Sequence, residues 1–250
     1  MITVSIVSHG HGELIPPLLD ELARCAEVTS ILLTLNVPEP VPAIPAALAQ
    51  RCTVISNPSP LGFGANHNQA FQRSGTPFFC ILNPDIRLPE NPFPPLLEAL
   101  HAQGCVLAAP AVVGPQGSIE DSARRVPTPW GLALKLARIS DGRYRYALGD
   151  KRFSPDWVGG MFMLVRSEAF AKAGGFDEAY FLYYEDVDLC ARLTLAGGKL
   201  LLCPDAKVIH DARRASHRNL RFLRWHLASM LRFFSSSAFW RLWWRKRWAA

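Results

Sequence analysis

The sequence predicts an α/β fold, with a mixed, mostly parallel sheet flanked by helices. Short apolar segments alternate with segments of helical spacing, which is typical of right-handed βαβ units. The ends of the predicted strands are polar, and ligands bind beyond the carboxyl ends of parallel strands in such sheets. The 250 residues, 49% of them hydrophobic and 19% charged, are enough to build one substantial core.

Strands and helices alternate most clearly in the first half of the chain. Apolar β-branched runs predict strands, and apolar positions three or four residues apart predict helices. The strands are expected at residues 2–7, 30–35, 52–56 and 77–82, and the helices at 14–26 and 66–73. Because parallel strands end at one edge, the sequence predicts a shared cleft lined by the polar residues that follow them: Ser8, His9, Asn36, Asn57, Asn83 and Asp85.

The second half mixes regular elements with a long irregular segment. A helix is expected at 93–103, a further helix begins at Glu185, and strands are expected at 106–113, 157–165 and 199–203. Gly159 and Gly160 interrupt the strand at 157–165, and glycines there indicate a bulge or the close approach of a ligand. Residues 118–151 are basic and irregular, so we expect either a mobile lid or a solvated face.

The stretch from Gly174 to Leu193 places acids among large aromatic residues. Acids usually face water and aromatics usually bury their area, so the mixture indicates the rim of a core or a site that needs acids beside an apolar wall. Such a wall raises the pKa of a carboxyl and makes it useful as a base. An acidic helix start is the alternative interpretation. The five acids are Asp177, Glu178, Glu185, Asp186 and Asp188.

Basic residues are concentrated towards the C-terminal end. Residues 207–250 hold eleven of the 27 Lys and Arg but a single acid, Asp211. The whole chain has a net charge of +6, yet the preceding residues are mildly acidic. This asymmetry indicates an anionic partner for the C-terminal part alone.

We expect one domain over residues 1–212 and a tail over 213–250. Residues 218–234 place apolar side chains on one helical face and arginines on the other, and residues 238–250 mix tryptophans with Arg and Lys. This composition suits an anionic membrane surface. A helix docked on the domain is equally open for 218–234, whereas 238–250 favour the membrane surface. Nucleic acid is not expected as a partner, because the strand ends are polar or acidic.

The remaining sequence features indicate a cytoplasmic protein. No run of about 18 uncharged apolar residues occurs, so no transmembrane span is expected. Residues 1–7 lack the basic and apolar regions of a signal peptide and are better interpreted as a first strand. The six cysteines are scattered without a Cys-x-x-Cys pair, which favours reduced core thiols over disulfides or zinc knuckles.

Four phrases of the sequence stand in a specific order over residues 2–232. They are Asn57 with Gly62-Phe63-Gly64 and Asn68, then Leu82-Asn83-Pro84-Asp85, then Gly174-Gly175-Phe176-Asp177-Glu178, and finally Tyr184-Glu185-Asp186-Val187-Asp188-Leu189-Cys190-Ala191-Arg192. Each phrase alone is weak. Together they resemble the inverting glycosyltransferases of family 2 with a GT-A fold, and among them the rhamnosyltransferase-like branch.

The resemblance implies a metal-dependent site for a nucleotide-sugar donor. Asp85 matches the last acid of the family's Asp-any-Asp motif, which binds Mg²⁺ or Mn²⁺ under the nucleotide diphosphate. His210 matches the histidine that completes the metal site in several relatives, although a capping or core histidine is the alternative. The residues expected around the donor are Ser8, His9, Asn36, Gly62, Asn68, Asn83 and Asp85.

The resemblance also assigns the catalytic base and the acceptor side. Asp186 matches the base that takes a proton from an acceptor hydroxyl while that oxygen attacks the anomeric carbon. Glu185 or Asp188 could exchange roles with it, but Asp188 is better explained as a partner of Arg192 or of a helix end. The acceptor side is expected to contain Trp157, Gly159, Gly160 and Glu185.

Two positions depart from the family pattern. Asn83 replaces the first acid of the metal motif, and Leu35 stands where relatives often carry the Asp that contacts the nucleotide base. A zinc site of His9, His11 and His210 is a weaker alternative to the metal site above.

The sequence therefore predicts a cytoplasmic enzyme, peripheral at the inner face of the membrane. It would transfer L-rhamnose from a dTDP donor, with inversion, onto a lipid-linked precursor of a cell-surface polysaccharide such as O-antigen. The donor sugar rests on the resemblance alone. Three alternatives stay open: a UDP-hexose donor, a non-catalytic scaffold at the membrane, and a metal-dependent hydrolase of sugar nucleotides.

Overall fold

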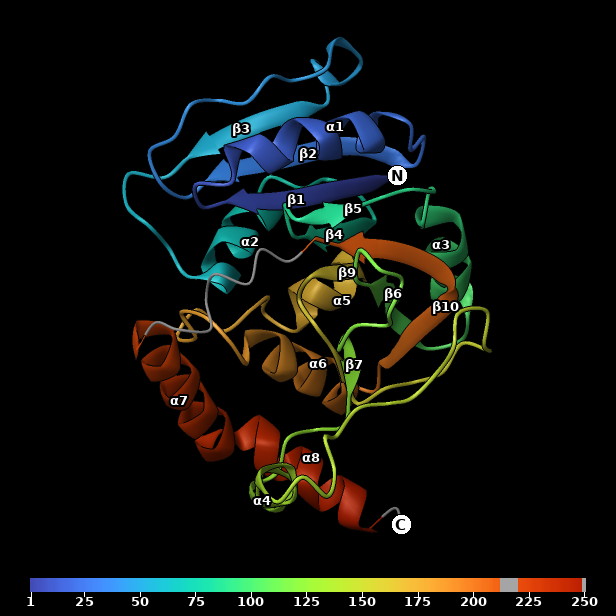
Figure 1. Cartoon of the computed structure of the whole chain (residues 1–250), viewed down its shortest axis with the longest axis vertical. Coiled ribbons are helices and arrows are strands. Elements are labelled where there is room, and N and C mark those ends of the chain that lie inside the picture. Colours follow the sequence, from blue (N-terminus) through green and yellow to red (C-terminus); the bar gives the residue numbers. More distant parts are fainter. Residues whose placement is uncertain (212–219, 249–250) are drawn as a thin grey trace.

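A computed structural model describes residues 1–211 and 220–248 of the chain. Its centre is an eight-stranded sheet in the order β3-β2-β1-β4-β9-β6-β10-β5, and a two-stranded sheet pairs β7 with β8 (Figure 1). The strands are β1 (Ile2–Ser8), β2 (Val28–Leu35), β3 (Cys52–Ser56), β4 (Phe78–Leu82), β5 (Ile86–Arg87), β6 (Cys105–Val113), β7 (Ala123–Arg124), β8 (Trp157–Val158), β9 (Phe162–Arg166) and β10 (Lys199–His210). The α-helices are α1 (Ile15–Ala23), α2 (Phe63–Phe71), α3 (Phe93–His101), α4 (Pro129–Leu136), α5 (Ser167–Lys172), α6 (Glu185–Leu195), α7 (Leu220–Ser235) and α8 (Ser237–Trp248).

The sheet is mixed and mostly parallel, as predicted. The strands β3, β2, β1 and β4 run parallel, and β6 and β10 form a second parallel pair. The strand β9 lies antiparallel between β4 and β6, and β5 lies antiparallel to β10 at the edge. Polar side chains at the ends of the parallel strands therefore meet at one edge of the sheet.

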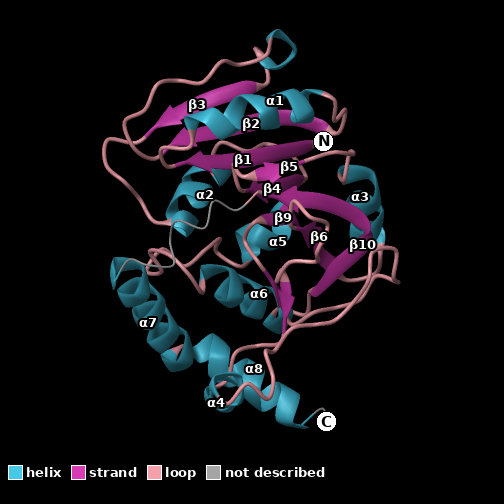
Figure 2. Cartoon of the chain, viewed as in Figure 1, coloured by secondary structure: helices cyan, strands magenta, loops and turns pink. Residues whose placement is uncertain are grey.

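Helices lie over both faces of this sheet (Figure 2), and an apolar layer packs beneath them on each face. One layer packs residues of α1 and α3 against the sheet, and the other contains buried residues of α2, α5 and α6. Because both faces are buried, the central strands contain near-continuous apolar runs such as Phe78–Leu82. The sheet is thus a rigid support for the loops at its carboxyl edge.

The last strand is longer than the sequence predicts. We expected residues 199–203, but β10 continues through Pro204 to His210. Proline cannot donate to the ladder, and the pairing of β10 with β6 shifts register between Cys203 and Lys207, so an irregularity absorbs it. As a result, His210 pairs with Ile86 at the end of the strand.

Three local predictions differ from the structure. The segment 118–151, expected to be irregular, contains β7 and α4, and α5 was not expected. The helix expected at 66–73 begins earlier, at Phe63, because Gly62 and Gly64 allow close packing of its first turn. The predicted break at Gly159 and Gly160 is confirmed, since β8 ends before them and β9 begins after them.

The tail helices pack partly on the domain. Phe233 of α7 and Phe239 and Leu242 of α8 are buried against Tyr184 and Val187 at the start of α6. The apolar face predicted for α7 is largely exposed, at Leu220, Leu223, Leu227 and Leu231. The predicted domain boundary at residue 212 lies outside the described residues.

In the described part of the chain, no helix combines the length and the apolar character needed to cross a membrane. All six cysteines are unpaired, and five of them are buried, as expected for core thiols.

Candidate active site

Asp186 lies in the first turn of α6 and is fixed by backbone donors. The Gly160 N–H donates to Asp186 Oδ2 at 3.0 Å, and the Val187 N–H donates to Oδ1 at 2.8 Å. A Cβ at position 160 would lie 3.2 Å from the Phe63 ring and 3.7 Å from Asp186 Cβ. The break between β8 and β9 therefore lets the backbone come close enough to orient the carboxylate.

The two acids at the start of α6 are held in an environment that opposes ionisation. Burial raises the pKa of Asp186, although the N–H groups of Gly160 and Val187 act in the opposite direction. Burial, followed by the charge of Asp186, raises the pKa of Glu185 well above its ordinary value. Within the described residues, Glu185 Oε2 is buried without a hydrogen-bond partner. Acids with raised pKa values are suited to proton transfer.

The backbone immediately before α6 is strained. Tyr183 and Tyr184 both have positive φ, of 71° and 67°. A left-handed conformation costs roughly 1–2 kcal/mol for a residue with a side chain. Packing compensates for this cost, because Tyr184 contacts the rings of Phe233, Phe234 and His226. The tail helices therefore help to hold the segment that presents Glu185 and Asp186.

A cavity of about 680 Å³ opens at Asp186 and Glu185. Its walls come from β7, β8, α4, the start of α6 and both tail helices, and include Arg124, Arg125, Trp130, Trp157 and Trp243. The Trp157 indole N–H donates to the Arg125 carbonyl at 3.0 Å, which joins two of these walls. The Gly159 N–H bonds the Ser122 carbonyl at 2.9 Å and supports the same junction.

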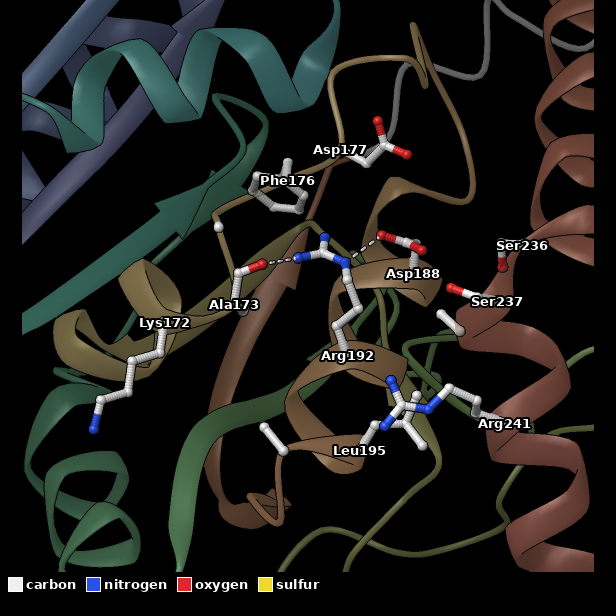
Figure 3. A pocket seen from close by; sticks show the side chains of 13 residues that line it. Lys172, Ala173, Phe176, Asp177, Asp188, Arg192, Leu195, Ser236, Ser237 and Arg241 are labelled. Atoms are coloured by element: carbon white, nitrogen blue, oxygen red, sulfur yellow. Dashed lines mark hydrogen bonds and ion pairs between the residues drawn. The ribbon is translucent and has the colours of Figure 1, made fainter.

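Asp188 points away from this cavity and pairs with Arg192, as expected. Arg192 Nε lies 2.7 Å from Asp188 Oδ2, and its Nη1 donates to the carbonyls of Ala173 and Gly175 at 2.5 and 2.7 Å. Figure 3 shows this cluster in a second cavity, of about 640 Å³, which also includes Arg241 of α8. Asp188 therefore orients Arg192, which anchors α6 to the loop after α5.

Three asparagines form a buried network at the carboxyl edge of β2 and β3. Asn57 Nδ2 donates to Asn36 Oδ1 at 2.9 Å and to Asn66 Oδ1 at 2.7 Å. Asn36 Nδ2 also donates to the Leu61 carbonyl at 3.0 Å, and its Oδ1 accepts from the Leu61 N–H at 2.8 Å. The same Nδ2 lies 3.2 Å from His9 Nδ1. Asn36 thus holds the loop that leads to α2. Asn57 was expected at this edge of the sheet, whereas the part of Asn66 in the network is visible only in the folded structure.

The Gly62-Phe63-Gly64 phrase is explained by contact with the loop before α6. A Cβ at Gly62 would lie 2.8 Å from the Phe181 carbonyl oxygen, and one at Gly64 would lie 2.6 Å from Phe176 Cβ. Asn68 holds the same loop, because its Oδ1 accepts from Phe176 N–H and its Nδ2 donates to the Phe176 carbonyl, both at 2.9 Å. Gly62 and Asn68 therefore link the predicted donor side to the catalytic segment.

Asp85 and His210 face each other, with Glu120 behind the histidine. Asp85 Oδ2 lies 3.2 Å from His210 Nε2, and Glu120 Oε2 lies 2.6 Å from His210 Nδ1. Burial lowers the pKa of His210, but the hydrogen bonds and charges of Asp85 and Glu120 outweigh it and raise the pKa to about 9. Asp85 Oδ1 is buried and makes no hydrogen bond among the described residues, so one carboxylate oxygen is available to a ligand.

Asp85 and His210 fit a site for a hard divalent cation once the cation displaces the proton on His210 Nε2. Mg²⁺ is commonly held by one or two protein groups together with substrate phosphates and water. Across residues 1–211 and 220–248, no group of three or more His, Cys, Asp or Glu has the geometry to bind a metal. The alternative zinc site is wrong, because His11 Nδ1 accepts from the His9 N–H at 3.1 Å and His210 is engaged by Asp85 and Glu120.

The other predicted donor residues also lie at the carboxyl edge of the sheet. Ser8 ends β1, and its hydroxyl accepts from the His11 N–H at 3.1 Å. Asn83 follows β4, and its N–H donates to the Met161 carbonyl at 2.9 Å, close to the Gly160 turn. The residues predicted for the donor and acceptor sides therefore converge between β4, β9 and α6.

The family model described as glycosyl transferase family 2 matches residues 36–171. The chain belongs to this family. The GT-A fold is also confirmed by solved structures. GalNAc-T7 with UDP, GalNAc and Mn²⁺ has a TM-score of 0.64 at 15% identity, and covers 85% of this chain and 44% of its own. Mannosyltransferase PcManGT from Pyrobaculum calidifontis, with GDP-Man and Mn²⁺, has a TM-score of 0.62 at 14% identity, with 92% and 64% covered.

Two curated relatives carry rhamnosyltransferase names. The chain is 30% identical to Rhamnosyltransferase WbbL of Escherichia coli (strain K12), over 93% of this chain and 92% of the relative. It is 31% identical to the N-acetylglucosaminyl-diphospho-decaprenol L-rhamnosyltransferase of Mycobacterium tuberculosis (strain ATCC 25618 / H37Rv), over 56% of this chain and 48% of the relative. The chain thus spans about half the length of the second relative.

Proposed function

We propose that this family 2 glycosyltransferase transfers L-rhamnose from dTDP-rhamnose, with inversion, to a saccharide carried on a lipid. The observation that carries the proposal is the position of Asp186, which lines the cavity and accepts a hydrogen bond from the Gly160 N–H. The next residue, Met161, accepts a hydrogen bond from the Asn83 N–H on the predicted donor side. The names of both relatives support rhamnose, and the name of the second supports a diphospho-lipid acceptor. A UDP-hexose donor is the alternative that the experiment below separates.

In the proposed reaction, Asp186 acts as the general base. One of its carboxylate oxygens accepts the proton of an acceptor hydroxyl while that oxygen attacks the anomeric carbon of the donor sugar. The bond from this carbon to the nucleotide diphosphate breaks on the opposite face, which inverts the configuration. The N–H groups of Gly160 and Val187 keep the carboxylate oriented throughout.

Asp85 and His210 would hold a divalent cation, Mg²⁺ or Mn²⁺, on the donor side. When bound, such a cation neutralises the charge that develops on the departing diphosphate. Glu120 accepts the Nδ1 proton of His210 and so directs Nε2 towards Asp85. Asn83 replaces the first acid of the family's metal motif, so its side-chain amide adds no negative charge beside the cation.

The proposal places the enzyme at the inner face of the cytoplasmic membrane, held there by the tail over 213–250. The exposed leucines of α7 and the exposed Trp240 and Trp244 of α8 support this role. Amphipathic helices that combine such residues with arginine bind anionic lipid surfaces. One side of α8 is buried against the domain, so the tail can dock on the domain while its exposed side contacts the membrane.

The test is a panel of dTDP- and UDP-sugars, measured by thermal shift with and without Mn²⁺ or Mg²⁺. A bound donor stabilises the folded protein by mass action. We expect stabilisation by dTDP-rhamnose that requires the metal and disappears in Asp85→Ala. If only a UDP-hexose stabilises the protein in a metal-dependent way, that UDP-hexose and not dTDP-rhamnose is the donor. No response to any sugar nucleotide would favour the non-catalytic scaffold, and turnover of a donor without acceptor would favour the hydrolase.

A further inference from the structure

The cavity at Asp186 changes character along its walls. At α6 it is lined by Glu185 and Asp186, at β7 by Arg124 and Arg125, and at α4 and α8 by apolar and aromatic side chains. Figure 1 shows α4 and α8 together at the end of the molecule remote from β1 to β3. Acidic, cationic and apolar walls thus follow one another from the catalytic base to the tail helices.

The order of these walls is fixed by the short β7–β8 ribbon. Arg124 pairs with Trp157, which stands three residues before Gly160, the residue that holds Asp186. Three residues of chain span at most about 11 Å, so the β7–β8 ribbon brings the backbone at Arg124 near the segment that holds Asp186. From Arg125 the chain continues directly to α4, which carries Trp130.

The two arginines differ in how far they are neutralised. Arg124 forms a two-pronged ion pair with Asp121, through Nε to Oδ1 and Nη2 to Oδ2, so its charge is already paired. Arg125 is exposed and lies 5.2 Å from the centre of the Tyr144 ring, and among the described residues no carboxylate forms an ion pair with it. The nearby Asp156 accepts from the Val126 N–H at 2.8 Å and from the Tyr144 hydroxyl at 3.2 Å. Arg125 is therefore the cation best placed to meet an anionic ligand.

The outer end of the cavity is apolar. Trp130 is 73% exposed although it lines the cavity, and it is accompanied by Leu132 and Leu134 of α4 and Leu242 of α8. Such exposure of a large apolar side chain beside a concave surface is typical of a binding site.

We propose that Arg125 and Trp130 are the residues by which this cavity recognises a lipid-linked acceptor, with Arg125 on its diphosphate and Trp130 on the start of its apolar chain. The inference rests on the proposed function and assigns specificity residues to it. Arginine binds phosphate oxygens through paired N–H donors, and an indole suits the boundary between a polar group and an apolar chain. The sugar hydroxyl would then meet Asp186.

The test compares three synthetic acceptors with the same N-acetylglucosaminyl unit. The first carries a diphosphate and an undecyl chain, the second a diphosphate and a methyl group, and the third an undecyl chain without diphosphate. The variants are Arg125→Gln and Trp130→Ala. Their matched controls are Arg145→Gln and Ile139→Ala, which change exposed residues of the same segment outside this cavity.

We expect Arg125→Gln to raise the acceptor KM about tenfold for both diphosphate compounds and to leave the third compound unchanged. Trp130→Ala should raise KM only for the compounds with the undecyl chain. The controls should resemble the wild type, and the donor KM should stay constant. Equal losses with all three acceptors, or equal effects of Arg125→Gln and Arg145→Gln, would overturn the inference.

A binding measurement separates this inference from the proposed function. Undecyl diphosphate without a sugar should quench the tryptophan fluorescence of the wild type, and about tenfold more should be needed with Arg125→Gln. If the wild type transfers sugar to all three acceptors equally well, the inference fails while the proposed function stands. If it transfers to none but binds undecyl diphosphate, the proposed function fails.

Discussion

Glu120 Oε2 lies 2.6 Å from Nδ1 of His210, while Nε2 of the same ring faces Asp85 Oδ2 at 3.2 Å. A carboxylate on one ring nitrogen fixes the orientation of a histidine that uses its other nitrogen as a ligand. Glu120 belongs to the segment after β6, and it reaches His210 because β10 continues past Pro204.

Glu120→Gln should therefore weaken metal binding. Loss of such a partner typically lowers metal affinity by roughly 10- to 100-fold, and we expect a value near tenfold because Gln can still accept a hydrogen bond. Titration calorimetry with Mn²⁺ in the presence of the donor nucleotide measures the affinity directly. Glu98→Gln is the matched control, since Glu98 forms an exposed ion pair with Arg152. Unchanged affinity in Glu120→Gln would remove Glu120 from the metal site.

The pKa of Glu185 predicts a pH-dependent stability. Its pKa is raised in the folded protein, so the folded state binds its proton more tightly than the unfolded state, and stability falls as pH rises above the ordinary value of about 4.3. Glu185→Gln removes the titrating carboxyl and with it the loss of stability at higher pH. The variant should be more stable than the wild type near pH 7.5, by about 1.4 kcal/mol for each unit of the pKa rise, and the difference should vanish towards pH 4.

Chemical denaturation of both proteins between pH 4 and pH 8 measures this difference. Glu178→Gln serves as the control, because Glu178 is exposed and forms an exposed hydrogen bond with Asn68. A gain for Glu185→Gln that is the same at every pH would show that its charge is not responsible.

Gly64→Ala should destabilise the fold and the active site together. The new Cβ would stand 2.6 Å from Phe176 Cβ, so the loop before α6 or the helix α2 must shift. Overpacking of this kind costs about 1–3 kcal/mol. Gly75→Ala is the control, since no atom lies within 4 Å of its added Cβ, and its effect should stay within about 0.5 kcal/mol. Urea midpoints compare the two variants, and an equal effect would contradict the close approach.

The exposed leucines of α7 predict binding to an anionic membrane. Leu223→Glu combined with Leu227→Glu should lower binding to phosphatidylglycerol vesicles at least tenfold, because it places two carboxylates on the exposed apolar face. Val41→Glu combined with Ile139→Glu adds the same charge at exposed apolar positions outside the tail. Vesicle co-sedimentation gives the comparison, and equal binding of both double variants would exclude α7 as the membrane-contacting surface.

The fold could be predicted largely from the sequence because its signals are local. The apolar runs of β1 to β4 and the spacing of α1 and α3 depend on neighbouring residues alone. The contact between Asp188 and Arg192 was also predictable, since residues four apart in a helix face each other. The resemblance supplied Asp186, and its contact with Gly160 gives that position a physical reason.

The remaining parts depend on contacts between distant residues. Glu120 stands in a segment without periodicity, and only the bulge in β10 brings His210 to it. The pairing of Asn57 with Asn36 and the cavity wall at Arg125 likewise depend on how separate loops meet at the sheet edge. A proline in an apolar run was interpreted as a strand end, whereas the strand absorbs Pro204 by shifting its register.

Asp186 is the residue on which the proposed transfer reaction depends most, as its general base. The most direct test is the rate of sugar transfer by Asp186→Asn at saturating donor and acceptor, with donor binding measured in parallel. Asn keeps the shape of the side chain but cannot take the proton, so kcat should fall by about a hundredfold to ten-thousandfold while donor affinity stays unchanged. Asp177→Asn, an exposed acid of the same stretch, should remain active. Transfer by Asp186→Asn at the wild-type rate would contradict the account.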